Sequence, residues 1–202
     1  MYAPSGRRTS VTGAFRPVDG SSVAVFRILF GLLCAYSAAR FVSKGWVESL
    51  YLAPDHHLTY PWFTGVRPLP APMMYAAVIA MVPLGLAIAV GWRTRVAATA
   101  YLGLFAYCEL IDAALYLNHY WYVTLALGLV VVLPLSGCWS FDARAGRVAP
   151  SPTVPVIVVW VLRGQLAVVY IMAGPGWASS TATGSGAASR WECGWHPAPT
   201  HR

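Results

Sequence analysis

Two carboxylates, Glu109 and Asp112, stand three residues apart in a strongly apolar stretch of the chain. On a helix this spacing places both side chains on one face, where each raises the pKa of the other or the pair attracts a cation. His119 follows closely, and an imidazole exchanges protons near neutral pH. We therefore consider His119 a candidate catalytic residue, with a hydrogen-bonded turn histidine as the alternative.

Three further polar residues, Arg27, Arg163 and Gln165, also lie within apolar runs. Charged side chains are costly at membrane depth, so those that are present usually face the interior of a bundle. Two interpretations stay open: the polar residues line a cavity, or the two arginines neutralise the two acids in a network that fixes the register of the helices. Under both, we expect Glu109 and Asp112 to approach Arg27 or Arg163.

The composition of the chain indicates what kind of structure must position these residues. Of the 202 residues, 57% are hydrophobic and only 10% are charged, against about 25% charged residues in soluble domains. The net charge of +7 comes from basic residues scattered in ones and twos, without the clustered basic face of a nucleic-acid-binding protein. The composition therefore predicts an all-α integral membrane protein and no nucleic-acid partner.

Five apolar segments are long enough to cross a lipid bilayer as helices, at roughly 20 residues per crossing. They cover residues 23–41, 73–90, 97–117, 120–135 and 155–173. Short polar connections separate these segments, and Asn118 and His119 form the turn of a tight hairpin between the third and the fourth. We predict a multi-pass transmembrane helical bundle of about five spans in the cell membrane.

The basic residues predict the orientation of this bundle. Seven arginines lie in the N-terminal tail, the second loop and the fourth loop, whereas the opposite loops hold only Lys44 and Arg67. Loops rich in basic residues stay on the cytoplasmic side of a membrane. We therefore expect residues 1–22 to form a cytoplasmic tail and the turn at His119 to lie on the outer side.

The cysteines and histidines do not predict a disulfide or a metal centre. Cys34 and Cys108 lie inside predicted spans, and Cys138 and Cys193 fall on opposite sides of the membrane. The adjacent histidines at 56–57 point in different directions, and no fourth ligand stands near them. We expect no disulfide within the chain and no bound metal.

Several segments of the chain, in order and at matching spacing, resemble one known family. They are SVAVFRILFGLL, PDHHLTYPWFTGVRPLP, LYLNHYWYVTLALGLVVVLP, WSFDA and VPVIVVWVLRGQLAVVYIMAG. Together they resemble the HTTM membrane domain of the vitamin K-dependent gamma-glutamyl carboxylase family over residues 17–174. We assign residues 23–174 to this membrane domain.

The resemblance implies a reaction, a cofactor and a substrate. In that family a lysine amine deprotonates reduced vitamin K, a quinol, which reacts with oxygen to give a strong base. The base removes a proton from the γ-carbon of a glutamate, to which carbon dioxide adds. The implied partners are therefore a quinone and a glutamate-containing protein substrate. His119, in the matching NHY segment, resembles the family histidine associated with forming the glutamate carbanion.

The chain departs from the family pattern after Gly174. The family continues with a lysine in a stretch like GxxKLxxDWLxxGEPLxxWL, whereas residues 175–202 contain no lysine, and Lys44 follows the first span. Restoring one base near this point permits GKLxxDWLxxGEPLGMWLA; Trp191 followed by Glu192, for example, must then give glycine. We expect a frameshift that truncates the domain and leaves residues 175–202 as an aberrant, disordered tail.

Two functions of different classes follow from these residues. The first is a carboxylase-like membrane protein that is inactive as written, because the family lysine is missing. The second is a non-catalytic membrane protein that binds a quinone or a lipid, or serves as a transporter-like partner, and uses its buried charges for packing.

Overall fold

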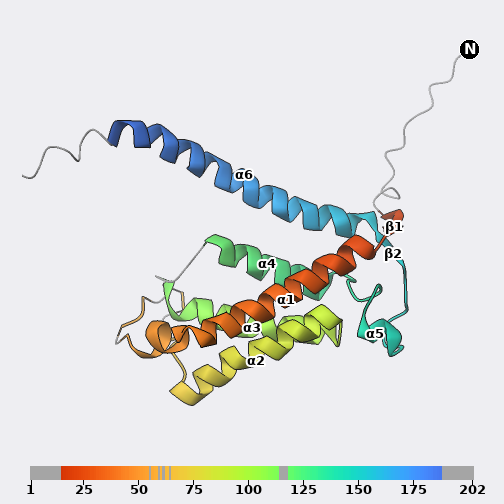
Figure 1. The fold of residues 1–202 in the computed structure, drawn as a ribbon, viewed down its shortest axis with the longest axis horizontal. Helices are drawn as coiled ribbons and strands as arrows, with labels where there is room; N and C mark the ends of the chain where they lie inside the picture. The colour runs from red at the N-terminus through yellow and green to blue at the C-terminus, as the bar shows by residue number, and fades with distance from the viewer. Residues whose placement is uncertain are drawn as a thin grey trace, which may run out of the picture. The chain divides into compact units, whose positions relative to one another are not determined.

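The computed structural model describes residues 15–54, 56–58, 60, 62–63, 65–113 and 118–187, without the side chains of residues 118 and 172–187. The elements follow one another as β1 (Pro17–Asp19), α1 (Ser21–Ser43), the π-helix η2 (Glu48–Leu52), α2 (Ala71–Val90), α3 (Thr94–Ile111), α4 (Asn118–Val132), α5 (Phe141–Arg144), β2 (Thr153–Pro155) and α6 (Val156–Ala187). The chain is therefore mostly helical, as its composition predicts (Figure 1).

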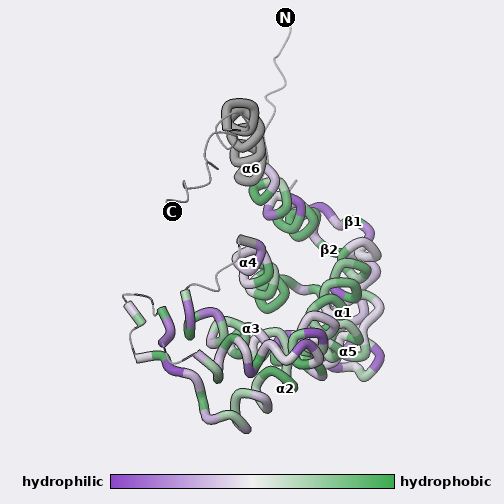
Figure 2. The backbone as a smooth tube through the Cα atoms, turned by 60° about the vertical axis from the view of Figure 1, so that its left-hand side comes forward, coloured by the Kyte–Doolittle hydropathy of each residue, from purple (hydrophilic) through white to green (hydrophobic). Residues whose placement is uncertain are grey.

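Two helices of the described chain, α1 and α2, are long and apolar enough to cross a membrane. Shorter apolar stretches occupy His119–Val132 and Val156–Ile171, and Figure 2 shows the apolar residues along these helices. Large apolar side chains such as Leu29, at 61% exposure, and Ile79, at 51%, point outward, as on helices that face lipid. The predicted five crossings stay a prediction.

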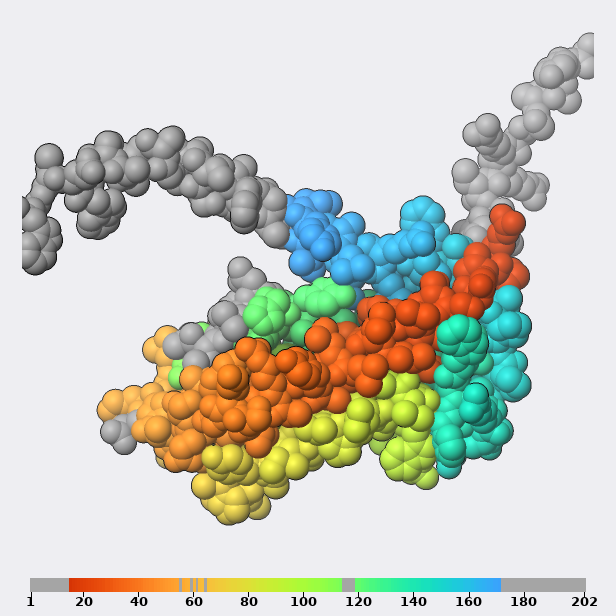
Figure 3. All heavy atoms as spheres, viewed as in Figure 1, coloured from red at the N-terminus to blue at the C-terminus, as the bar shows by residue number. Residues whose placement is uncertain are grey.

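The helices α1 and α2 pack closely because two glycines stand at their contact. A Cβ atom at Gly85 would lie 2.6 Å from the backbone nitrogen of Ala35, and one at Gly31 would meet the backbone of Ala89. Small residues allow two helices to approach at backbone distance, which is a common mode of packing in membranes. In Figure 3, the atoms of α1 lie directly along those of α2.

The chain divides into two compact units, one ending at Leu162 and the other beginning at Arg163. In the first unit, buried side chains of α1 to α4, β2 and the start of α6 form one apolar core. A smaller cluster, which includes Val47, Tyr51 and Met74, lies around η2. In the second unit α6 continues as a helix to Ala187.

The backbone of residues 175–187 belongs to α6, and the predicted disorder of the tail 175–202 stays a prediction. This stretch contains three alanines, Ala178, Ala182 and Ala187, and alanine favours a helix. The predicted frameshift concerns the codons and not the backbone, so it stays a prediction. Residues 188–202 lie outside the described part of the chain.

A short antiparallel pairing, which the sequence does not predict, joins the segments before α1 and α6. Val18 of β1 stands opposite Val154 of β2. The backbone N–H of Gly20 donates to the carbonyl of Pro152 at 2.8 Å, and that of Val156 donates to the carbonyl of Arg16 at 3.0 Å. The beginnings of α1 and α6 are therefore held at the same end of the first unit.

Arg27 of α1 is completely buried, with 0% exposure. Its Nη1 donates to the carbonyl oxygens of Leu135 at 2.8 Å and Cys138 at 3.1 Å, and its Nη2 donates to that of Trp139 at 2.7 Å. These carbonyls belong to the segment between α4 and α5. One guanidinium thus ties the second turn of α1 to a segment more than a hundred residues later.

Asp142 holds the beginning of α3 in the same region. Its carboxylate accepts the backbone N–H groups of Arg93 at 3.0 Å and Thr94 at 3.2 Å, and Nη1 of Arg147 lies 3.3 Å away. Burial raises the pKa of this carboxyl, but the three donors outweigh it, so the pKa lies below its usual value. Asp142 caps a helix whose own N-cap side chain makes no such hydrogen bond.

Replacing Arg27 with methionine should lower the free energy of unfolding by about 3 kcal/mol or more, since each buried carbonyl left without a donor costs about 1–3 kcal/mol. Arg27→Lys should recover little, because one ammonium cannot reach three carbonyls as a planar guanidinium does. Thermal unfolding in detergent micelles measures the change, with the exposed Arg144→Met as control. Equal stability of Arg27→Met and Arg144→Met would contradict the stabilising role of the Arg27 guanidinium.

Asp142→Asn should destabilise the protein at neutral pH, because an uncharged amide is a weaker acceptor for backbone N–H groups. A carboxyl whose pKa is lowered by folding adds stability above its unfolded-state pKa of about 3.9, and this stability is lost as the pH falls through the lower folded-state value. The difference between wild type and variant should shrink below about pH 4. Chemical denaturation as a function of pH tests this; a gap that stays constant into acid would refute it.

Candidate functional site

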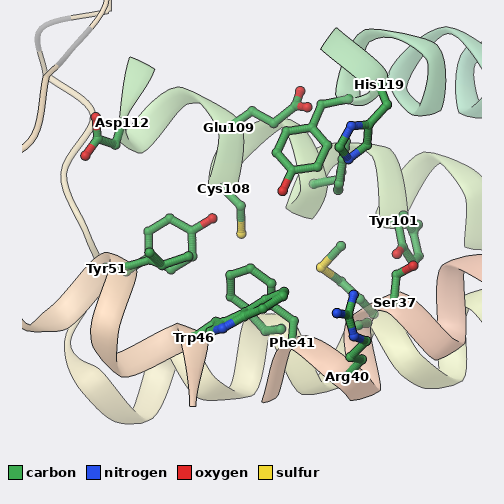
Figure 4. Close-up of a pocket in the computed structure, with 16 residues that line it drawn as sticks. Ser37, Arg40, Phe41, Trp46, Tyr51, Tyr101, Cys108, Glu109, Asp112 and His119 are labelled. Carbon is green, nitrogen blue, oxygen red and sulfur yellow. The ribbon is translucent and has the colours of Figure 1, made fainter. Parts of the chain in front are cut away.

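A cavity of about 480 Å³ lies at the end of the first unit where α1 and α3 end and α4 begins. It is lined by Ser37, Ala38, Arg40, Phe41, Trp46, Leu50, Tyr51, Val78, Met81, Tyr101, Phe105, Cys108, Glu109, Asp112, His119 and Tyr120. Figure 4 shows Glu109 and His119 on one wall, with Arg40, Phe41 and Trp46 on the wall that faces them. A mostly apolar pocket of this size with a few polar groups is typical of a small-molecule site.

Aromatic side chains form much of the cavity wall. The ring of Phe41 lies edge-on to Trp46, with centroids 5.5 Å apart, and stacks on Tyr51 at 5.8 Å. Phe105 of α3 lies edge-on to Tyr120 of α4 at 5.6 Å. The ring packing fixes these side chains in place, and their flat faces and edges suit a planar aromatic ligand.

Charged groups reach the same cavity from two helices. The guanidinium carbon of Arg40 lies 5.1 Å from the ring centroid of Trp46, a cation–π arrangement. Oε2 of Glu109 accepts the hydroxyl of Thr124 at 3.1 Å, while its Oε1 is buried and has no hydrogen-bond partner among the described residues. A buried acceptor without a donor is costly in a folded protein, so Oε1 is suited to a ligand hydroxyl.

His119 stands in the first turn of α4. Its ring lies nearly perpendicular to that of Tyr120, with centroids 4.7 Å apart. The residue lines the cavity and is also exposed. Its imidazole can therefore exchange a proton between a group in the cavity and the surrounding water.

Tyr51 and Cys108 complete the wall beside η2, and Figure 4 shows both side chains directed into the cavity. Burial raises the pKa of the Tyr51 phenol well above its usual value, with a smaller contribution from the nearby Cys108. The phenol therefore keeps its proton at neutral pH and can donate a hydrogen bond.

Asp112 lies at the edge of the cavity, directly after the last residue of α3. Its Oδ2 is 3.3 Å from Nδ1 of His57, and its Oδ1 accepts the backbone N–H of Leu58 at 3.3 Å. The backbone N–H of Ala113 donates to the carbonyl of Leu58 at 2.7 Å. These bonds tie the loop that follows η2 to the end of α3.

The structure separates the polar residues that the sequence groups together. Glu109 and Asp112 line one cavity with His119, which favours the cavity interpretation for these residues. The expected approach of Arg27 to the two acids is wrong, because its guanidinium is bound to backbone carbonyls. Arg27 also lies ten residues before Ser37, about 15 Å along the helix axis.

Arg163 and Gln165 belong to the second unit, where Arg163 is exposed and Gln165 is half-buried. The two acids belong to the first unit, and the predicted approach of Arg163 to them stays a prediction. Asp112 has a partner that the sequence does not suggest, His57.

Three cavity residues, Arg40, Trp46 and Tyr51, are not among the predicted site residues. For Trp46 and Tyr51 the sequence offers a partial signal, because both follow the end of the predicted span 23–41, where aromatic residues often anchor a membrane helix. It offers none for Arg40, because an arginine at the end of a span is usually a solvated charge.

Metal-binding groups are dispersed in the described part of the chain, which holds no cluster of three or more His, Cys, Asp and Glu side chains that could bind a metal ion. Cys34, Cys108 and Cys138 are free thiols. Cys193 lies outside the described residues.

A family model described as the HTTM domain matches residues 15–188. Because this match spans most of the chain, the chain belongs to the HTTM domain family, and the resemblance to the HTTM domain is confirmed. The attribution to the carboxylase family is consistent with this match and stays a prediction. The match runs past Gly174 into the segment that the sequence pattern marks as aberrant. No solved structure matches the chain.

Proposed function

We propose that this chain is a multi-pass membrane protein that binds an aromatic lipid of the quinone class in the cavity at the ends of α1 and α3. The observation that carries the proposal is the cavity itself. Its walls are aromatic, and the charged or titratable side chains of Arg40, Glu109 and His119 reach it from three helices. Membership of the HTTM family, which is consistent with a carboxylase-like protein, supports the same ligand class.

The proposed topology has five crossings, formed by α1, α2, α3, α4 and α6, with the N-terminus in the cytoplasm. The ends of α1 and α3 and the beginning of α4 surround the cavity, as alternating crossings require. The seven-to-two distribution of basic residues supports this orientation. The cavity then lies at the outer ends of the helices in the cell membrane.

The residues present fit reduced vitamin K, the cofactor that the family implies. Phe41, Tyr51 and Tyr120 would hold a fused aromatic ring, since they offer flat apolar surfaces. Oε1 of Glu109 would accept a ring hydroxyl, and the Tyr51 phenol would donate to a ring oxygen. When bound, a quinol supplies an oxidisable ring with two acidic hydroxyls.

The side chains of this chain would manage the proton and charge of such a ligand. His119 would accept a proton at its imidazole and release it to water on its exposed side. The guanidinium of Arg40, held over Trp46, would favour a negative charge on the ligand. A glutamate-containing protein substrate would approach at the exposed face of His119.

We infer that the chain as written does not carboxylate glutamate. The family chemistry begins with a lysine amine, and no lysine lines the cavity. Lys44 is the single lysine of the sequence and lies in the turn after α1. Neither a carboxylate nor an imidazole supplies the desolvated amine that this step uses. Ligand binding without turnover is therefore the expected behaviour.

Reporter fusions test the topology. A periplasmic reporter such as alkaline phosphatase should be active when fused in the loop that follows η2. It should be inactive when fused between α5 and β2, because Arg144 at the end of α5 and Arg147 after it mark a cytoplasmic loop. A cytoplasmic reporter at the same two positions should give the opposite pattern. Alkaline phosphatase activity after α5 would overturn the orientation.

Binding of menadione, a naphthoquinone, to the full chain in lipid nanodiscs tests the ligand class. Quenching of tryptophan fluorescence should saturate, and the saturable part should disappear in Trp46→Phe. Phe41→Ala should weaken binding roughly twofold to tenfold, because an aromatic contact is worth about 0.5–1.5 kcal/mol. Tyr36→Ala is the matched control, since Tyr36 is exposed on the same helix and does not line the cavity.

Two outcomes would contradict the proposal in different ways. Quenching that rises without saturation, or equal losses in Phe41→Ala and Tyr36→Ala, would reject a quinone site in the cavity. Incorporation of labelled bicarbonate into a glutamate peptide by the chain as written would instead reject the inferred lack of carboxylation.

His119→Ala should leave menadione affinity nearly unchanged, since the proposed role of His119 is proton exchange.

A further inference from the structure

A second cavity, of about 650 Å³, lies around the beginning of α3 and the segment that joins α4 to β2. Three arginines line it, Arg93, Arg95 and Arg147, together with one acid, Asp142. We propose that this cavity binds a phosphate group. The site is separate from the aromatic cavity, with which it shares no lining residue, and its assignment does not depend on the proposed quinone ligand.

The charge of the single acid is already compensated within the fold. Asp142 accepts two backbone N–H groups, from Arg93 and Thr94, and lies 3.3 Å from the Arg147 guanidinium. Within the described residues, the guanidinium groups of Arg93 and Arg95 form no ion pair with a carboxylate. Two positive charges therefore border the cavity without a counter-charge from the protein.

Thr94 supplies a second, independent observation. It lines the cavity and is only 2% exposed, yet its Oγ1 is buried and has no hydrogen-bond partner among the described residues. A buried hydroxyl without a partner is unfavourable. A phosphate oxygen in the cavity would give this hydroxyl a hydrogen-bond partner, while the backbone N–H groups of Arg93 and Thr94 at the beginning of α3 already bind Asp142.

Phosphate is the anion that suits these groups best. Guanidinium forks match the spacing of phosphate oxygens and bind them with paired charge-assisted hydrogen bonds. The phosphate could come from the headgroup of an anionic lipid or from free phosphate in solution. Under the proposed topology this end of the chain faces the cytoplasmic membrane surface, where anionic lipids attract basic side chains.

Thermal unfolding of the full chain in neutral detergent tests the proposal. Three additions are compared: dioleoyl phosphatidylglycerol, dioleoyl phosphatidylcholine and inorganic phosphate. Phosphatidylglycerol or inorganic phosphate should raise the Tm of the wild type in a saturable manner. A rise with phosphatidylglycerol alone identifies a lipid headgroup, whereas a rise with inorganic phosphate identifies a site for free phosphate, and both support the proposal.

Two variants and one matched control separate a built site from general attraction of anions. Arg95→Gln and Thr94→Val should each lose at least half of the Tm shift. Thr94→Val should be no less stable than the wild type without ligand, because its hydroxyl makes no hydrogen bond to the described residues. Arg144→Gln removes the same charge from an exposed residue outside the cavity and should keep the shift.

Three results would overturn the phosphate site. The first is a Tm that does not respond to phosphatidylglycerol or to inorganic phosphate. The second is an equal loss of the shift in Arg95→Gln and Arg144→Gln, which would indicate diffuse electrostatic attraction. The third is a shift of the same size with phosphatidylcholine, accompanied by no effect of Arg95→Gln or Thr94→Val.

Discussion

The buried guanidinium of Arg27 is the interaction on which the rest of the first unit depends. A charge at the centre of an apolar bundle is tolerated only where polar groups surround it, and here three backbone carbonyls after α4 do so. Space around it is limited: a Cβ at Gly91, whose φ is +78°, would lie 3.1 Å from its Cζ atom. The end of α2, the segment after α4 and the first turns of α1 must therefore adopt their positions together.

This rigid end contrasts with the opposite end of the same helices. Around Arg27, Asp142 caps α3 and the β1–β2 pair fixes the beginning of α1, although Nε of Arg27 and Oγ1 of Thr94 have no hydrogen-bond partner among the described residues. Around Glu109, a carboxylate oxygen is buried without one, and aromatic rings enclose an open volume. Helices tied together by hydrogen bonds at the Arg27 end provide a stable frame for the ligand site at the other end, because binding groups need a scaffold that does not collapse onto them.

Much of the helical architecture could be predicted from the sequence, because apolar runs of sufficient length leave few alternatives. The predicted spans 23–41 and 73–90 correspond closely to α1 and α2. The third prediction extended to residue 117, whereas α3 ends at Ile111 and Asp112 adopts an extended backbone. Hydropathy does not show this break, because Ala113 and the residues after it remain apolar in the sequence. The carboxylate of Asp112 lies outside the helix and contacts His57 and Leu58 of the loop after η2.

The sequence by itself determined the family, the helical class and the candidate role of His119, Glu109 and Asp112, since residue types and their order along the chain carry this information. Only the tertiary structure decided which polar groups meet. Arg27 and Arg163 balance Glu109 and Asp112 in a count of charges. The guanidinium of Arg27 nevertheless binds backbone carbonyls, which every residue carries and which the sequence therefore does not single out. Arg40 and Trp46 join Glu109 at one cavity because the packing of the bundle brings together residues more than sixty positions apart. Such proximity depends on helix packing and close glycine contacts, which are physical properties of the folded chain and not of any local pattern.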